Sequence, residues 1–346
     1  MNNPFLTISI PTYNRGFYLS QLLDSILDNQ LLHLGVRVYV SDNASTDDTG
    51  IILDSFYKKF PALLTYNIAN DNLGADANYL KCLTVPSSKY IWLFGSDDLT
   101  SPDAISTVVK LLHANLDSDI HLFSRLNFYK SIDETTLQHF CAASSLDKSF
   151  SIADKPNTIR YTLLLKNSRD IAISFSYITS CIVSSAKVKL FLSEQHPKYL
   201  NSLYVHVEIF LSLLVNGSTL RVYSYAPILN RCNNDSFVGK DRSKRRMVDY
   251  GLKRIAQHVF RNEKYIYNEY IRLLGRQFLP PRIAIGDLSR AFRDGGLSSL
   301  KDLNSSRNFT FAELPVLRCL SKFYEFFLPP WFLKVLFKIN KLLLFP

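Results

Sequence analysis

Two adjacent carboxylates, Asp97 and Asp98, follow the apolar run Tyr90–Phe94 after only a glycine and a serine. An apolar run of this length that ends in a turn signal predicts a buried strand. The two carboxylates would then lie just beyond its carboxyl end, where open α/β sheets bind their ligands. Adjacent carboxylates there suit a hard cation such as Mg²⁺, which takes few protein ligands together with substrate phosphates. The alternative is that they only cap a helix that follows Pro102.

Three earlier segments repeat this arrangement of a buried strand followed by polar residues. Residues 5–10, 36–40 and 64–68 are apolar or β-branched and predict strands. The polar clusters that follow them are Thr12-Tyr13-Asn14, Asp42-Asn43 and Asn70 to Gly74. The carboxyl ends of parallel strands lie along one edge of a sheet. We therefore expect all four clusters to share one cleft, which favours a binding site over four unrelated loops.

Helical patterns separate the four strands and place them in a parallel sheet. Two helices are expected from Ile51 onward and through Tyr79, and the first helix has apolar residues at helical spacing, namely Leu19, Leu22, Leu23, Ile26 and Leu27. The order β-α-β-α-β-α-β predicts an α/β fold with a mostly parallel sheet flanked by helices on both faces. The turn after the first strand has neither G-x-G-x-x-G nor a P-loop lysine, which argues against a Rossmann dinucleotide site and a P-loop NTPase.

The charges are distributed unevenly along the 346 residues. Residues 1–150 carry 10 Lys/Arg and 16 Asp/Glu, a net −6, and the remaining residues carry 30 and 14, a net +16. Such asymmetry is typical of a protein whose basic half meets something anionic, either nucleic acid or a lipid surface; solvated basic faces are the alternative. Five scattered cysteines without a C-x-x-C pair indicate neither a disulfide framework nor a zinc site. We expect a cytoplasmic setting, because no signal peptide or membrane-spanning run is recognisable.

Four tracts together resemble the nucleotide-sugar glycosyltransferases of family 2, which have the GT-A fold. They occur in the expected order over residues 5–105 and are Ile10-Pro11-Thr12-Tyr13-Asn14, Ser41 to Thr49, Asn72-Leu73-Gly74 with Asn78, and Asp97-Asp98. Within that family, the resemblance is to the abequosyltransferase group, and it rests on Phe94 to Asp98, Tyr204 to Val207 and Arg231 to Phe237. This wider resemblance covers roughly residues 5–255.

The resemblance implies an activity and its partners. Enzymes of the abequosyltransferase group add a 3,6-dideoxyhexose from a CDP-sugar to an O-antigen repeat unit linked to undecaprenyl diphosphate. The implied partners are therefore a nucleotide-sugar donor, a lipid-linked oligosaccharide acceptor and the cytoplasmic membrane surface, and no nucleic acid. The implied fold is GT-A, a Rossmann-like, mostly parallel sheet flanked by helices.

The resemblance also implies roles for individual residues. Those expected to surround the nucleotide are Pro11, Tyr13, Asn14, Asp42, Asn72, Gly74 and Asn78. Of these, Tyr13 would line the base and ribose pocket, and Asp42 would bind the base or the ribose. Asp97 would hold Mg²⁺ or Mn²⁺ on the diphosphate, with Ser96 and the catalytic Asp98 beside it. Such a metal neutralises the charge of the leaving group as a Lewis acid.

The chain departs from the family's pattern at two places. Its carboxylate-x-carboxylate motif has Gly95 in the place of the first acid, so metal binding would rest mainly on Asp97 and water. Many inverting members also carry a Glu-Asp pair before the acceptor-site helix, with the Asp as general base. Here Val205-His206 occupies that place, and Glu208 stands two residues on.

His206 and Glu208 each have two interpretations. His206 could act as the base, because an imidazole has a pKa near neutrality, or it could cap or pack the start of the helix predicted over 207–214. Glu208 could be catalytic or a partner of the helix dipole. Abequose-type linkages are expected to keep the donor's anomeric configuration, and a front-face mechanism then needs no strong base.

The middle of the chain predicts less regular structure. Residues 126–155 predict an irregular insertion, and further strands are expected at Tyr177–Ser184 and Thr219–Tyr223. The basic tract Asn230–Arg246 would be either a solvated loop or a lid that contacts the donor diphosphate, and its family-like residues are Arg231, Asn234 and Asp235. Helical stripes begin near Val248.

The segment Trp331–Phe345 predicts a short amphipathic helix, in which Lys334, Lys338 and Lys341 share one face. A basic helix with a broad apolar face and an initial Trp is typical of an interfacial membrane anchor; packing on the core is the alternative. An anchor would place the protein peripherally on the inner face of the cell membrane. We therefore expect a GT-A domain over residues 1–235 and a basic helical extension over 236–346 that ends in this helix.

Two other classes of function are alternatives to this interpretation. A basic nucleic-acid-binding protein would show affinity that falls steeply with salt, but no recognition motif supports it. A degenerate glycosyltransferase fold, motivated by Gly95 and the missing general base, would bind CDP or UDP and release no sugar.

Overall fold

The structure of the protein is a computed structural model. It describes residues 3–101, 103–128, 149–151, 175–195, 197, 202–231, 242–268 and 270–271. The chain groups into two compact units, residues 1–267 and 268–346. The predicted site residues Asn234 and Asp235 and the predicted helix Trp331–Phe345 lie outside the described residues, as does most of the predicted extension.

The first part of the chain forms the parallel sheet that the sequence predicts. The strands β2, β1 and β4 lie next to one another in that order, with β3 outside β2, and all three pairings are parallel. The elements of this part are β1 (Leu6–Thr12), α1 (Gly16–Ile26), α2 (Gln30–His33), β2 (Val36–Asp42), α3 (Thr49–Lys59), β3 (Leu64–Ile68), α4 (Ala75–Thr84) and β4 (Tyr90–Leu93). The order of these elements is the one expected.

The later part of the chain extends the same sheet. Among the described residues the sheet has nine strands, in the order β3-β2-β1-β4-β8-β6-β9-β5, and β7 pairs with β9. The remaining elements are β5 (Leu99–Thr100), α5 (Ala104–His113), β6 (Ile120–Phe128), β7 (Ser149–Ser151), the 3₁₀ turn η1 (Ile178–Ser180), β8 (Cys181–Ser184), α9 (Ser185–Glu194), α10 (Val205–Val215), β9 (Leu220–Arg231) and α11 (Arg242–Val259). The pairings of β8 are antiparallel, whereas β6 and β9 are parallel to each other.

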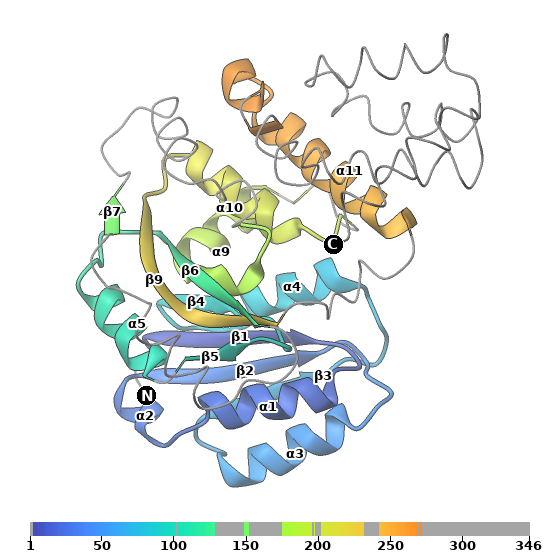
Figure 1. Cartoon of the computed structure of the whole chain (residues 1–346), viewed down its shortest axis with the longest axis vertical. Helices are drawn as coiled ribbons and strands as arrows, with labels where there is room; N and C mark the ends of the chain where they lie inside the picture. Colours follow the sequence, from blue (N-terminus) through green and yellow to red (C-terminus); the bar gives the residue numbers. More distant parts are fainter. Residues whose placement is uncertain are drawn as a thin grey trace, which may run out of the picture. The chain divides into compact units, whose positions relative to one another are not determined.

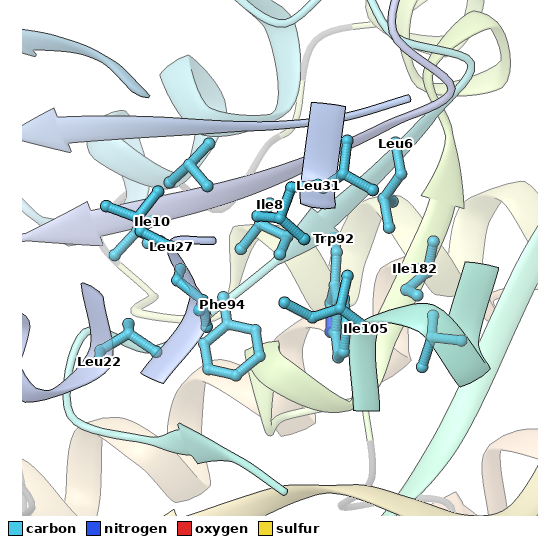
Figure 2. Packing of buried hydrophobic residues seen from close by; sticks show 14 of the residues in the cluster. Leu6, Ile8, Ile10, Leu22, Leu27, Leu31, Trp92, Phe94, Ile105 and Ile182 are labelled. Atoms are coloured by element: carbon cyan, nitrogen blue, oxygen red, sulfur yellow. The ribbon is translucent and has the colours of Figure 1, made fainter. Parts of the chain in front are cut away.

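Helices cover both faces of the sheet, as Figure 1 shows, with α1 and α3 on one face and α4, α9 and α10 on the other. Alternate residues of a strand point to opposite faces. Leu6, Ile8 and Ile10 of β1 therefore pack with Leu22 of α1 and Trp92 of β4 in one buried cluster (Figure 2). This core holds the strands in place and thereby positions the polar residues at their carboxyl ends.

The structure differs from the sequence-based expectation in its later elements. Residues 126–128 of the predicted insertion belong to β6, a strand that the sequence did not predict, and residues 149–151 form β7. The expected strand Tyr177–Ser184 is a 3₁₀ turn followed by the short β8. The basic residues from Arg242 onward lie in α11 and not in a loop. No helix of the described part is both long and apolar enough to cross a membrane.

Candidate active site

The carboxyl ends of β1 and β2 carry two buried oxygens on the same face of the sheet. Thr12 and Asp42 are register partners, so their side chains project from that face together. Asp42 is 1% exposed, and its Oδ1 accepts hydrogen bonds from the backbone N–H of Ser45, at 3.1 Å, and from the Ser45 hydroxyl. Asp42 Oδ2 and Thr12 Oγ1 have no hydrogen-bond partner among the described residues. Buried polar atoms are normally paired, so these oxygens are suited to a ligand.

The loops that follow β1 and β2 are joined by Asn14. Its φ of 51° lies in the left-handed region, which asparagine tolerates. Its N–H donates to Ser45 Oγ at 2.8 Å, and its Oδ1 accepts from the N–H of Thr46 at 2.8 Å. Pro11 is buried in β1, while Tyr13 beside Asn14 is 43% exposed. Asn14 therefore shapes the loops, and Tyr13 is free to line a ligand.

The loop after β3 is fixed to the same edge by two asparagines. Asn43 Nδ2 donates to Asn72 Oδ1 at 2.8 Å and to the carbonyl of Gly74 at 3.1 Å, and Asn43 Oδ1 accepts from the N–H of Leu73. Gly74 has a φ of 86°, a conformation that strains other residues. The buried Asn78 Nδ2 donates to two carbonyls at the ends of β1 and β2. Hydrogen bonds within the protein therefore hold the loops after β1, β2 and β3 in place without a ligand.

Asp98 is buried behind the end of β4, and protein groups hold both of its carboxylate oxygens. Its Oδ2 accepts a hydrogen bond from the hydroxyl of Thr179, and its Oδ1 accepts one from the backbone N–H of Arg231 at 3.2 Å. Burial, followed by the charge of Asp97, raises the pKa of Asp98 to about 7, although the two hydrogen bonds act in the opposite direction.

Asp97 is more accessible than Asp98 and pairs with a cation. Its side chain is 27% exposed, and its Oδ2 lies 3.5 Å from an Arg15 guanidinium nitrogen. The backbone carbonyl of Asp97 accepts a hydrogen bond from Arg231 Nε at 3.0 Å, and Arg231 also donates to Gln21 Oε1 at 2.7 Å. Protein groups therefore already engage the Arg231 guanidinium, which braces the turn at Asp97.

The donor set at this turn fits a divalent cation held largely by its ligand. The described residues contain no group of three or more His, Cys, Asp or Glu side chains that could form a protein cage for a metal. Asp97 offers one partly exposed carboxylate, whereas the oxygens of Asp98 are turned toward protein donors. Mg²⁺ usually takes one or two carboxylates and completes its shell with water and substrate phosphates. Such an ion would therefore contact the protein through Asp97.

His206 is packed inside the protein. It is 1% exposed and lies among Tyr79, Tyr204 and Phe210, with ring centroids 5.2, 6.0 and 6.1 Å away. Neither ring nitrogen reaches hydrogen-bond geometry with a described residue. Burial lowers the pKa of His206 to about 3, although the nearby backbone groups of Ser176 and Phe175 act in the opposite direction. These surroundings favour the packing interpretation over the general base.

The lowered pKa of His206 predicts a loss of stability in acid. The unfolded chain takes up its proton near pH 6.5 and the folded chain near 3, so the free energy of unfolding falls as the pH drops below about 6.5. Between pH 7 and pH 5 this single group accounts for a loss of about 2 kcal/mol. His206→Phe should flatten the pH dependence of urea unfolding by that amount. The exposed His33, replaced by Gln, serves as control, and an unchanged slope in His206→Phe would contradict the prediction.

The start of α10 is tied to α4 by the side chain of Asp76. Asp76 is 3% exposed, and its carboxylate accepts hydrogen bonds from the N–H groups of Leu203, at 3.0 Å, and Val205, at 3.1 Å. It thereby satisfies donors at the N-terminus of α10, which otherwise lack partners within the helix. Glu208 is buried in the first turn of α10 at 2% exposure. It is therefore less accessible to a substrate than Asp97.

The structure brings together most of the predicted residues and adds others. Asp42, Asn72, Gly74 and Asn78 converge at the ends of β1 to β3, and the buried Ser96 lies in the turn with Asp97 and Asp98. Arg15, Asp76 and Thr179 were not among the residues predicted from the sequence, and Asn43 was predicted only as a member of the polar cluster that follows the second strand. Arg15 and Asn43 stand within recognisable tracts and could have been selected by position. Asp76 and Thr179 act on partners 81 to 129 residues away, and no local pattern marks them.

Comparison with known proteins assigns this site to a family. The model of "Glycosyl transferase family 2" matches residues 7–185, more than half of the chain and all strands from β1 to β8. The chain is a family 2 glycosyltransferase. The predicted family is thereby confirmed, and with it the prediction of an enzyme of the hexosyltransferase class. The matched segment includes Asp42, Asp97, Asp98 and Thr179.

Individual relatives of this family 2 glycosyltransferase agree with that assignment. The abequosyltransferase RfbV of Salmonella typhimurium is 30% identical over 266 residues, which cover 76% of each chain. Among solved structures, TarS of S. aureus in complex with UDP-GlcNAc superposes with a TM-score of 0.58 at 14% identity, covering 91% of this chain and 83% of that one. A mannosyltransferase of Pyrobaculum calidifontis in complex with GDP-Man and Mn²⁺ gives 0.51 at 14% identity, covering 93% and 84%. The structural matches confirm the GT-A fold.

Proposed function

We propose that this family 2 glycosyltransferase moves a 3,6-dideoxyhexose from a CDP-sugar to a hexose of an undecaprenyl-diphosphate-linked O-antigen oligosaccharide. The observation that carries the proposal is the placement of two acidic sites at one edge of the sheet. The unpartnered oxygen of the buried Asp42 ends β2, and the Asp97–Asp98 turn follows β4, with β1 between them. The similarity to the Salmonella abequosyltransferase supports the choice of sugar and acceptor.

The nucleoside would bind at the ends of β1 and β2. Asp42 Oδ2 is a buried carboxylate oxygen that can accept a hydrogen bond from a ribose hydroxyl or a base N–H, and Tyr13, which follows the end of β1, has an exposed ring that could contact the nucleoside. Hydrogen bonds to charged groups are stronger than neutral ones. The hydrogen bonds of Asn14, Asn43 and Asn78 hold these loops in place before the donor binds. Binding therefore loses less conformational entropy.

The transfer itself would take place beside Asp97 and Asp98. A Mg²⁺ or Mn²⁺ ion held by Asp97 would neutralise charge on the leaving diphosphate when bound. Asp98, fixed by Thr179 and Arg231, would face the transferred sugar. With retention of configuration, the acceptor hydroxyl bonds to the anomeric carbon on the face from which the diphosphate leaves, and a diphosphate oxygen can take the hydroxyl proton. This route needs no protein base, in agreement with the burial of His206.

The membrane is part of the proposed setting. An undecaprenyl-linked acceptor lies in the bilayer with its headgroup at the surface. We therefore propose that the enzyme lies peripherally at the cytoplasmic face of the cell membrane, and that residues 331–345 dock it there through their apolar and lysine residues.

A donor panel tests the proposed function. Purified enzyme, membranes that carry the lipid-linked acceptor and labelled CDP-, UDP-, GDP- and dTDP-sugars should give labelled lipid with CDP-dideoxyhexose and little with the others. Nucleotide binding without labelled product from any donor would favour a non-catalytic glycosyltransferase fold, an alternative motivated by Gly95. His206→Phe should retain turnover. A fall in turnover on the order of a hundredfold would instead support His206 as the general base.

Asp42→Asn is expected to raise the KM for the donor about 10- to 100-fold while leaving kcat nearly unchanged. The substitution keeps the shape of the side chain. Because the oxygen at the Oδ1 position accepts from Ser45, the asparagine amide nitrogen, a donor, would stand in the place of Oδ2. The charged hydrogen bond to the nucleoside, which contributes about 1.5–3 kcal/mol, is then lost. Initial rates over a range of donor concentrations measure it. Asp48→Asn, an exposed change on the same loop, is the matched control. An equal rise of the donor KM in both variants, or no rise in either, would show that Asp42 does not bind the nucleotide.

A further inference from the structure

Thr179 connects the end of β4 to the carboxylate of Asp98. Its side chain is 3% exposed, and its hydroxyl accepts a hydrogen bond from the backbone N–H of Gly95 at 2.9 Å and donates one to Asp98 Oδ2. Its own carbonyl accepts from the indole N–H of the buried Trp92 at 2.7 Å. Thr179 is therefore held at both its main chain and its side chain by residues of one segment, 92–98.

The direction of these hydrogen bonds is fixed by the groups that make them. The N–H of Gly95 can only donate, so it occupies one lone pair of the Thr179 hydroxyl. The ionised carboxylate of Asp98 can only accept, so the hydroxyl proton goes to Asp98. The N–H of Arg231 donates to the other carboxylate oxygen. Two fixed donors on the two oxygens define the plane of the Asp98 carboxylate.

The absence of a side chain at Gly95 makes this arrangement possible. A Cβ at this position would lie 2.9 Å from Asp98 Oδ2 and 3.1 Å from Thr179 Oγ1, closer than such atoms normally approach. The space that a first acid of the motif would need is therefore taken by the Thr179 hydroxyl and the carboxylate it orients. Gly95, which departs from the family's motif, thus leaves the space that the Thr179 hydroxyl and the Asp98 carboxylate occupy.

We propose that Thr179 is a positioning residue for Asp98: its hydroxyl sets the orientation in which Asp98 meets the transferred sugar. This inference rests on the proposed function, in which Asp98 faces that sugar. The role requires an oxygen at the γ position and not a particular size, so serine can fill it and valine cannot. Ser180 provides a contrast, because it is also fully buried but its hydroxyl has no partner among the described residues.

Kinetics of four variants test the proposal. Thr179→Val, which keeps the shape, should lower kcat on the order of ten- to a hundredfold, since a small misplacement of a reacting group costs that much. The donor KM should stay within about threefold, because the nucleoside side is untouched. Thr179→Ser and Ser180→Ala should stay close to the wild type. Thr179→Ala removes the same hydroxyl and introduces a smaller side chain than valine does. It serves as the test if the valine variant does not fold.

Three kinetic results would overturn the proposal: full kcat in Thr179→Val, an equal loss in Ser180→Ala, or no rescue by Thr179→Ser. Hydrogen exchange of the Gly95 amide gives a readout that needs no turnover. It should be protected in the wild type, Thr179→Ser and Ser180→Ala, and exchange faster in Thr179→Val and Thr179→Ala. An enzyme that turns over no donor would contradict the proposed function, while unchanged exchange in Thr179→Val would contradict the positioning role.

Discussion

Replacing Asp97 with asparagine is expected to lower transfer on the order of a hundred- to a thousandfold. Asp97 is the partly exposed carboxylate of its turn, while both oxygens of Asp98 are taken up by protein donors. Asparagine keeps the shape and removes the charge, so a divalent cation loses its proposed protein ligand. Stabilisation of charge at a leaving group typically contributes factors of this size.

Two measurements separate this effect from a general disturbance. Asp103→Asn is the matched control, because Asp103 is exposed, makes no cap hydrogen bond and has a φ of 57°, which asparagine tolerates. It should keep normal turnover. Calorimetry of Mn²⁺ in the presence of CDP should show weaker metal binding in Asp97→Asn and unchanged binding in the control. Normal turnover of Asp97→Asn would refute the assigned metal ligand.

Restoring the acid that the family's motif usually carries, by Gly95→Asp, is expected to lower turnover on the order of a hundredfold. Motif logic alone predicts the opposite, since a second carboxylate would be added beside Asp97. The structure predicts a loss because a Cβ at position 95 would meet Asp98 Oδ2 at 2.9 Å. Overpacking of this kind also costs about 1–3 kcal/mol of stability.

The matched control for this variant is Gly50→Asp. A Cβ at Gly50 has one neighbour, at an ordinary 3.5 Å, and an acid in the first turn of α3 is favourable to the helix dipole. The double variant Gly95→Asp/Thr179→Ala should regain part of the lost stability in thermal unfolding, since the hydroxyl that crowds the new side chain is gone. Higher turnover or tighter Mn²⁺ binding in Gly95→Asp would contradict the packing argument.

Much of the donor side could be predicted because its signals are local. Asp42 is the last residue of the buried strand β2, and Asp97 lies four residues beyond the end of β4. A strand end of a parallel sheet fixes where such residues lie. The family pattern and the fold followed from the same short tracts. Asn43, however, lies next to Asp42, and only the structure separates the residue that braces the loops from the one with an unpartnered oxygen.

The later part of the chain could not be predicted as well, because contacts distant in sequence decide its structure. Residues such as His121, Ser124 and Arg125 interrupt the apolar pattern of β6, and the strand forms through its pairing with β9. His206 has the side chain of a general base. Phe210, four residues on in α10, could have been expected beside it, but the ring of Tyr79 comes from α4, and no spacing in the sequence reveals that contact. Likewise, nothing in the sequence indicates that Thr179 and Arg231 donate hydrogen bonds to Asp98.

The long separation between Asp98 and its partners also has a consequence for how the enzyme is made. Thr179 follows Asp98 by 81 residues, and Arg231 follows it by 133. At about 5–20 residues per second, the ribosome needs on the order of ten seconds to add the last of these partners. The strands that carry Asp42 and Thr12 leave the ribosome well before that time. A nascent chain therefore contains Asp42 and Thr12 well before it contains the residues that hold the Asp98 carboxylate, so a chain that terminates in the interval lacks both of those donors.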